Sequence, residues 1–210
     1  MRRTAVLGAG LSCGVVAVGC AAAMVTSQGT SRSSISACSG PRWHVKTLSD
    51  PLAGRVSDNP RQSSIGALRQ LRTPRRLTAR TPRRRGPERT TYRVNARLVE
   101  MELEKDGDVI LVAVDPKTKD KLAVEFPASG CMRRASAKHR SLMKSARAAL
   151  IAACGKPSST GNEIGGSTTI TGVGFFEPGD GVPPEGQNRF ELHPVVGFRA
   201  NCVLGAAPSE

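Results

Sequence analysis

Alternating hydrophobic and polar residues in the second half of the chain predict β-strands. From Tyr92 to Leu98 every second residue is hydrophobic, and the alternation then continues on the opposite parity from Val99 to Leu103. Such a change of phase within one strand predicts a β-bulge or a sharp bend. The same criteria predict strands over residues 109–114, 121–126, 168–176 and 190–198, with a hairpin turn at 105–108 and a flexible loop at 158–166.

One long helix is predicted between the third and fourth of these strands. Leu142, Ala146 and Leu150 recur at helical spacing within residues 136–153, and Gly155 and Pro157 follow that stretch. The resulting order, β-β-β-α-β-β with a long first strand, is that of a five-stranded OB-like β-barrel. The chain is therefore predicted to be mainly β, with one helix. A different small α+β sheet with one covering helix is the alternative.

The first residues have the pattern of an export signal. Arg2 and Arg3 precede an uncharged stretch of apolar and small residues from Ala5 to Val25. Residues 1–26 are accordingly predicted to be a signal peptide or a membrane anchor, and Cys20 is a candidate for lipidation. Cleavage, lipid attachment and an uncleaved membrane span all stay open. In each case the chain is predicted to be exported across the inner membrane, to the cell envelope or the extracellular space.

Residues 27–87 are rich in serine, arginine and proline and are predicted to form a disordered basic arm. Eleven arginines and only two acidic residues lie between positions 51 and 90, where several prolines interrupt any long helix. Within the arm, residues 42–47 alternate and predict a short edge strand that docks on the domain, and residues 64–71 predict one or two helical turns. The domain itself is predicted over residues 88–203, followed by a flexible tail at 204–210.

The net charge of +14 favours an anionic partner such as nucleic acid, anionic lipid or an acidic glycan. Aromatic residues make up only 3% of the chain, which counts against binding of single strands by base stacking. Outside the export segment there are four cysteines, none in a Cys-x-x-Cys spacing, and in an exported chain they are candidates for two disulfides of open connectivity. These cysteines are Cys38, Cys131, Cys154 and Cys202.

Several segments taken together resemble a family of uncharacterised exported bacterial proteins. The shared motifs are W-x-V-K-T from Trp43, Y-x-V-x-A-x-L from Tyr92, T-G-V-G-F-F-E from Thr171 and E-L-H-P-V from Glu191. The resemblance implies export and a common fold, and it implies no particular activity. Members of that family have histidines at the position of Ile110 and after the F-F-[DE] motif, whereas this chain keeps only the histidine of E-L-H-P-V.

That histidine, His193, is the best candidate for chemistry. Glu191 lies two residues before it, so strand alternation places both side chains on one face, and the loop that begins at Glu177 could approach them. The three residues are weak catalytic candidates, because the simpler interpretation is a strand-end histidine that hydrogen bonds to backbone. No third metal ligand is evident from the spacing, so neither a metal site nor a cofactor is predicted.

The sequence therefore predicts a binding or interaction module rather than an enzyme, although the question of catalysis stays open. OB-like barrels bind ligands on the face of their second and third strands and on the adjoining loops. The basic residues expected around that face are Arg97, Lys105, Lys117, Lys119 and Lys121. An anionic macromolecule or envelope component is the predicted partner. The alternatives are a nucleic-acid or polyanion binder that uses the arginine-rich arm, and a hydrolase with its site around His193.

Overall fold

A computed structural model of the chain describes residues 38–179 and 188–205. The predicted export segment, including Cys20, and the end of the predicted tail lie outside the described residues. Among the described residues, none of the helices has the length and apolar character needed to span a bilayer.

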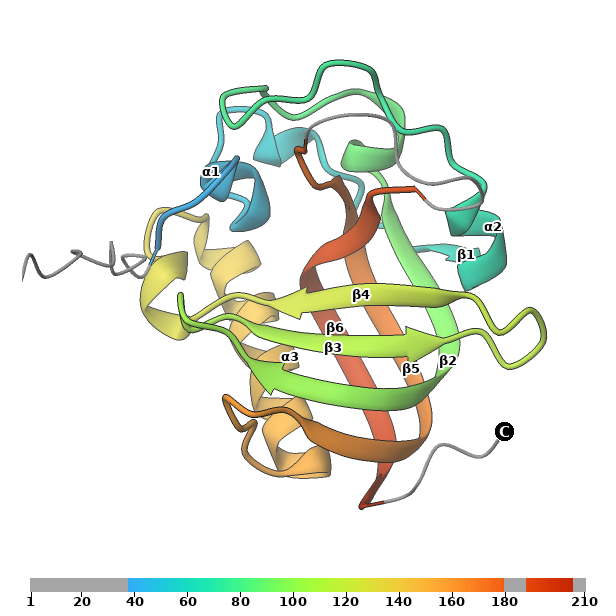
Figure 1. Cartoon of the computed structure of the whole chain (residues 1–210). Helices are drawn as coiled ribbons and strands as arrows, with labels where there is room; N and C mark the ends of the chain where they lie inside the picture. The colour runs from blue at the N-terminus through green and yellow to red at the C-terminus, as the bar shows by residue number, and fades with distance from the viewer. Residues whose placement is uncertain (1–37, 180–187, 206–210) are drawn as a thin grey trace, which may run out of the picture. The chain divides into compact units, whose positions relative to one another are not determined.

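The fold is mainly β, with one six-stranded sheet. Its strands lie in the order β1-β2-β3-β4-β6-β5, and β2 also pairs with β5, so that five of the strands close into a ring (Figure 1). All neighbours in the ring are antiparallel except β4 and β6. The strands are β1 Arg61–Ser63, β2 Thr91–Leu103, β3 Val109–Val114, β4 Lys121–Phe126, β5 Asn162–Phe176 and β6 Phe190–Leu204. The helices are α1 Trp43–Lys46, α2 Ile65–Arg69 and α3 Ala137–Cys154, with 3₁₀ turns at Ala53–Arg55, Gly86–Arg89 and Ser129–Met132.

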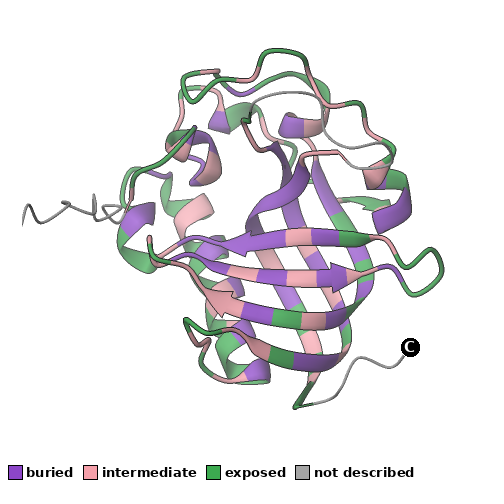
Figure 2. Ribbon diagram, viewed as in Figure 1, coloured by how far each residue is buried: buried purple, intermediate pink, exposed green. Residues whose placement is uncertain are grey.

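The change of phase predicted within the first long strand is confirmed in β2. Its register with β3 shifts between Leu98 and Glu100, and its register with β5 shifts at the same place. On either side of the shift the inward-facing residues are buried, as Leu98 and Met101 are. The bulge bends β2, which pairs with β5 from Thr91 to Met101 and with β3 from Arg97 to Leu103. Buried and more exposed residues alternate along the strand (Figure 2).

The predicted helix is confirmed as α3, which packs against β6. The Ser136 side chain accepts a hydrogen bond from the His139 backbone N–H, and Gly155, with a φ of 79°, ends the helix. Its buried side is formed by Met143, Ala146, Leu150 and Cys154. The last two strands are longer than predicted: β5 begins at Asn162, within the predicted flexible loop, and β6 continues to Leu204. Their added residues pair with each other, which the hydropathy pattern alone does not show.

The predicted disordered arm is wrong for residues 38–87, which pack against the sheet. Strand β1 runs parallel to β2, and Ile65 and Leu68 of α2 belong to the main hydrophobic core. The domain therefore begins near residue 38 rather than at residue 88. The predicted edge strand at 42–47 is also wrong, because α1 occupies this stretch. Its backbone groups bond within the segment, as Val45 N–H does to Arg42 O.

Buried guanidinium groups explain why this arginine-rich segment is ordered. Arg42 donates to both carboxylate oxygens of Glu88 at 2.6 Å, and both side chains are completely buried. Arg83 is also buried, and it donates to Asp50 at 2.9 Å and to the carbonyl oxygens of Val45 and Glu88. The composition of the segment predicts solvated arginines, whereas these two have buried partners that only the fold brings near.

Two disulfides connect elements that are distant in sequence. Cys38 pairs with Cys131 across a Cα–Cα distance of 5.0 Å, and Cys154 pairs with Cys202 across 5.1 Å. The first connects the start of the described chain to the 3₁₀ turn before α3, and the second connects the end of α3 to β6. The connectivity that the sequence leaves open is thus specified by the fold.

Replacing Arg42 by Met is expected to lower the free energy of unfolding by about 3–5 kcal/mol, because it leaves the Glu88 carboxylate buried without its cation. Urea denaturation followed by circular dichroism measures the change. Lys138→Ala is the control, since Lys138 and its partner Asp58 have side chains that are 59% and 61% exposed, and it should leave the midpoint nearly unchanged. A loss no larger than that of the control would contradict this role of the pair.

Candidate functional site

Six ionisable side chains meet where β4 ends and β6 begins, beneath α1. We call this group, which consists of Lys46, Asp108, Glu125, Glu177, Glu191 and His193, the ionised centre. Lys46 comes from α1, Asp108 from the β2–β3 turn, Glu125 from β4, and Glu191 and His193 from β6. His193 is completely buried, and Asp108, Glu125 and Glu191 are at most 7% exposed.

The predicted candidates His193, Glu191 and Glu177 are brought together in this centre. His193 Nδ1 lies 3.4 Å from Glu191 Oε1, as expected for neighbours on one face of a strand. Glu177 Oε2 lies 2.9 Å from Lys46 Nζ, which also lies 3.9 Å from Glu191 Oε1. The lysine therefore connects Glu177 to the residues of β6.

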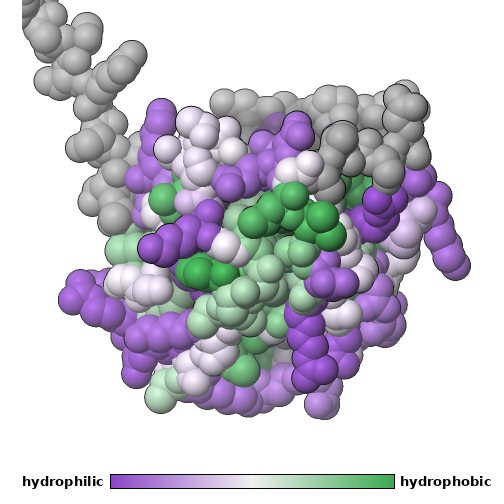
Figure 3. All heavy atoms as spheres, turned by 90° about the horizontal axis from the view of Figure 1, so that it is seen from below, coloured by the Kyte–Doolittle hydropathy of each residue, from purple (hydrophilic) through white to green (hydrophobic). Residues whose placement is uncertain are grey.

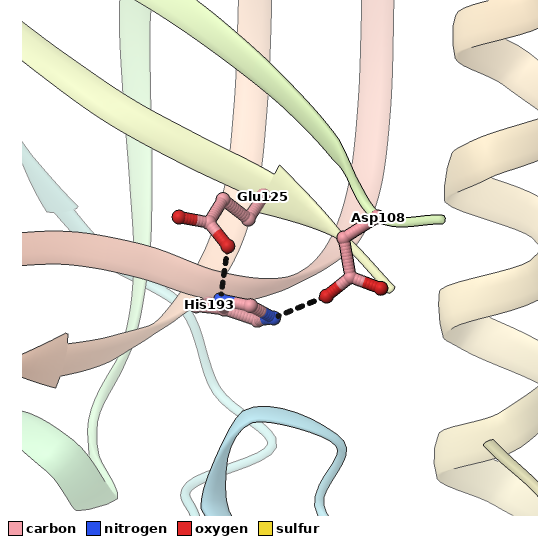
Figure 4. A group of neighbouring side chains, drawn as sticks. All are labelled: Asp108, Glu125 and His193. Atoms are coloured by element: carbon pink, nitrogen blue, oxygen red, sulfur yellow. Dashed lines mark ion pairs between the residues drawn. The ribbon is translucent and has the colours of Figure 1, made fainter. Parts of the chain in front are cut away.

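Two further carboxylates face the imidazole ring from its two ends (Figure 4). Glu125 Oε2 lies 2.8 Å from His193 Nδ1, and Asp108 Oδ2 lies 3.6 Å from Nε2. By distance, both contacts are ion pairs when the imidazole is protonated. Neither ring nitrogen has an aligned hydrogen-bond partner within the described residues, and the same holds for Glu191 Oε1.

Burial and mutual charge displace the pKa values of the centre in opposite directions. Burial raises the pKa of Glu191, and the neighbouring charge of Glu125 adds to it, so that the pKa reaches about 8. For Glu125 the effect of burial is outweighed by His193 and Lys46, which lower its pKa to about 2. Burial alone lowers the pKa of His193, but Glu125 and Glu191 outweigh it and raise the pKa to about 10. Both His193 and Glu191 thus hold their protons to a higher pH than the isolated side chains do.

The excess of negative charge extends to neighbouring groups. Burial, together with the charges of Glu125 and Asp106, raises the pKa of Glu104 to about 7. The pKa of Asp108 is also raised, chiefly by burial. Lys46 responds in the opposite sense: burial lowers its pKa, and the carboxylates of Glu191, Glu125 and Glu177 outweigh this and raise it.

Sequence reasoning missed Lys46, Asp108 and Glu125 as members of this site. Asp108 lies in the predicted hairpin turn at 105–108 and Lys46 in the W-x-V-K-T motif of the predicted arm, and neither position by itself indicates a site. Glu125 carries the one signal that could have found it: it is an acidic residue between Val124 and Phe126, near the end of a strand that is otherwise buried. A carboxylate at such a position needs a partner inside the fold.

A second site covers the outer face of β2, β5 and β6, and we call it the arginine face. Cross-strand pairing arranges its outward side chains in three rows. The rows are Arg93–Thr171–Gly197, Asn95–Thr169–Arg199 and Arg97–Ser167–Asn201. Two grooves of about 580 and 480 Å³ run over these rows, and their lining residues include no acidic side chain in the described part of the chain.

The predicted basic ligand residues are divided between two ends of β3. Arg97 is exposed opposite Val114, and the β3–β4 turn that follows Val114 carries the exposed Lys117 and Lys119, with Lys121 opening β4. Pro116 of this turn lines the same groove as Arg97. Lys105, in contrast, is exposed in the β2–β3 turn at the other end of the strand. Four of the five predicted residues thus adjoin the arginine face.

Comparison of the chain with protein-family models, with curated proteins and with solved structures finds no match. The resemblance noted from the sequence motifs therefore remains a prediction.

The end of the molecule that lies at the bottom of Figure 1 is partly hydrophobic at its surface. Seen from below, it presents hydrophobic residues near its middle and hydrophilic ones around them (Figure 3). Val203 and Leu204, at the end of β6, are 51% and 63% exposed. A surface of aliphatic carbon attracts no anion, so this end is a poorer candidate for an anionic ligand than the arginine face is.

Replacing Glu191 by Gln is expected to remove part of the pH dependence of stability. Between about pH 5 and 8 the Glu191 carboxyl keeps its proton in the folded state and is ionised in the unfolded state. Unfolding therefore releases a proton, and raising the pH favours unfolding. The free energy of unfolding of Glu191→Gln, taken relative to that of the wild type, should therefore rise by ~2 kcal/mol as the pH is raised across this range.

Urea denaturation at several pH values measures this difference. Glu163→Gln is the control, since Glu163 lies exposed on β5, and its curve should run parallel to that of the wild type. Parallel curves for Glu191→Gln as well would mean that Glu191 is ionised in the folded protein.

Proposed function

We propose that this chain is an exported protein of the bacterial cell envelope whose OB-like domain binds an anionic partner through the arginine face, without catalysing a reaction. The observation that carries the proposal is the set of three cross-strand rows, in which guanidinium, amide and hydroxyl groups alternate over three strands. These groups donate hydrogen bonds to phosphate, sulfate or carboxylate oxygens.

The strand arrangement supports the OB-like assignment. The strands follow one another around the ring in the order β2-β3-β4-β6-β5, β4 and β6 are parallel, and α3 lies between β4 and β5 in the chain. This arrangement agrees with that of an OB-like barrel. Export is supported by the basic and apolar start of the chain and by the two disulfides, since disulfides persist in oxidising compartments.

The charges on the face support an anionic ligand rather than a neutral one. Arg199 is exposed and has no carboxylate partner among the described residues, and Arg93 makes only a long hydrogen bond, of 3.4 Å, to Thr171 Oγ1. Both guanidinium groups line the larger groove. Since they carry no structural ion pair, they are available to a ligand at little cost to the fold.

The arginine-rich segment is the competing surface. Two of its arginines, Arg42 and Arg83, are buried and hold the fold together, and cannot contact a polyanion. Others remain exposed, among them Arg75, Arg76 and Arg80. A partner that binds this segment instead would respond to those residues and not to the arginine face.

Two variants that each remove two positive charges distinguish the surfaces. Arg93→Gln with Arg199→Gln should weaken binding of a labelled polyanion about 10-fold or more, because each lost contact to a charged group is worth on the order of 1 kcal/mol at an exposed site. Arg75→Gln with Arg80→Gln should change it no more than about 2-fold, the effect expected of charge lost from a distant surface.

Fluorescence anisotropy with labelled single-stranded DNA, duplex DNA and heparin, at two salt concentrations, measures these affinities. Equal losses in both variants would indicate a nonspecific response to net charge. A larger loss in the second variant would assign binding to the arginine-rich segment, and no binding by the wild type would remove nucleic acid and heparin as partners.

A further inference from the structure

The ionised centre contains a set of side chains that suits a metal ion, and the function proposed above does not use it. Asp108, Glu125 and His193 each offer one ligand atom, and these atoms all lie within 4.8 Å of one another. They come from the β2–β3 turn, from β4 and from β6. Two carboxylates and one imidazole are ligands typical of divalent first-row transition metals.

The unpartnered nitrogen atoms of His193 are a separate observation that points to a ligand. The imidazole is completely buried, and neither of its nitrogens has an aligned hydrogen-bond partner among the described residues, although carboxylate oxygens lie 2.8 and 3.6 Å away. Leaving a buried polar atom unsatisfied costs ~1–3 kcal/mol. A cation bound through one imidazole nitrogen and one oxygen of each carboxylate would give that nitrogen a partner and neutralise the two acids.

The charge balance favours the same conclusion. Four carboxyl groups surround a single lysine and a single histidine. With Glu191 protonated, the other three carboxylates leave a net charge of −1 when His193 is protonated and −2 when it is neutral and able to bind a metal. Buried charges are stable only when they are paired or coordinate a metal. A divalent cation would neutralise most of this excess.

The backbone that carries the two carboxylates is fixed from outside the centre. Arg147 of α3 donates to the carbonyl oxygen of Gly107 at 2.9 Å and to that of Phe126 at 2.7 Å. These carbonyls belong to the residues next to Asp108 and Glu125. In addition, Asp108 Oδ1 accepts a hydrogen bond from Ala128 N–H at 2.7 Å, which leaves Oδ2 facing the imidazole. Such support is what orients the ligands of a metal site.

We propose that Asp108, Glu125 and His193 bind a divalent transition-metal ion, of which zinc is the best match to the ligands. The 3.6 Å between Asp108 Oδ2 and His193 Nε2 is close to the separation of two ligands on one zinc ion, whose bonds are about 2.0–2.2 Å long. Lys46 opposes the metal, because its ammonium lies 3.8 Å from the Glu125 carboxylate and competes for it.

The test is metal binding by the full chain, with Cys13 and Cys20 replaced by Ser to remove thiols that bind zinc on their own. Isothermal titration with zinc, after treatment with a chelator, should give one ion per chain. Titration with cobalt(II) should give the visible absorption of a site with nitrogen and oxygen ligands, without thiolate bands.

Asp108→Asn and His193→Gln should each weaken zinc binding at least 10-fold, because even changing a residue that only orients a ligand typically costs that much, and these are direct ligands. The matched controls are Asp120→Asn, in the β3–β4 turn, and His139→Gln, on α3. Both should bind zinc like the parent. Asp108→Asn keeps the shape of the side chain, so it tests the site even if His193→Gln does not fold, which circular dichroism reports.

Lys46→Met distinguishes a metal site from a purely structural ion network. Removing the competing ammonium should tighten zinc binding at least 10-fold, since the repulsion by a unit charge about 4 Å away is well above the ~1.4 kcal/mol that corresponds to 10-fold. The proposal is overturned if the parent binds no zinc, if the control variants lose binding as the site variants do, or if Lys46→Met weakens binding. None of these outcomes affects the arginine face, which is tested by polyanion binding.

Discussion

The buried pair of Arg42 and Glu88 is the contact on which the arrangement of this domain depends. The Glu88 carboxylate accepts from both terminal nitrogens of Arg42, and also from the backbone N–H groups of Arg84 and Phe176. Arg42 in turn donates to the carbonyl oxygen of Phe176. One carboxylate thereby joins the start of the described chain, the turn before β2 and the end of β5. Because every polar atom of the pair has a partner, the cost of burying two charges is offset.

This pair also determines what the ionised centre can be. Arg42 immediately precedes α1, and α1 carries Lys46 into contact with three carboxylates. Glu125 and Glu191 both lie against Nδ1 of His193, and Lys46 adds a second positive charge beside these two buried acids. Burial and the charge of Glu125 raise the pKa of Glu191 to about 8, whereas His193 outweighs burial at Glu125 and lowers its pKa to about 2; Lys46 lowers both values. The N-terminal segment, which the sequence predicts to be a disordered arm, thus contributes Lys46 to the ionised centre.

The two candidate sites use opposite electrostatics and lie on different parts of the ring. The arginine face is exposed, positive and built from the outward residues of β2, β5 and β6, so it suits a large anionic partner at the surface. The ionised centre is buried, negative and built from turn and strand-end residues, so it suits a small cation. If both proposals hold, a cation would stabilise the fold while the outer face binds a ligand.

Local patterns in the sequence were sufficient for most of the strands, for α3 and for the bulge in β2. Each of these depends on residues close together in the chain: alternation at period two, helical spacing with a cap, or a change of phase. The same locality placed Glu191 and His193 on one face of β6. Beyond that, the tertiary structure decided. The order of residues 38–87 depends on arginines whose acceptors lie tens of residues away, as Glu88 lies from Arg42. The ionised centre needs Lys46, Asp108 and Glu125, which come from three separate elements. The closed ring of strands brings their charges within 4 Å of His193 or of one another, and no spacing in the sequence predicts this.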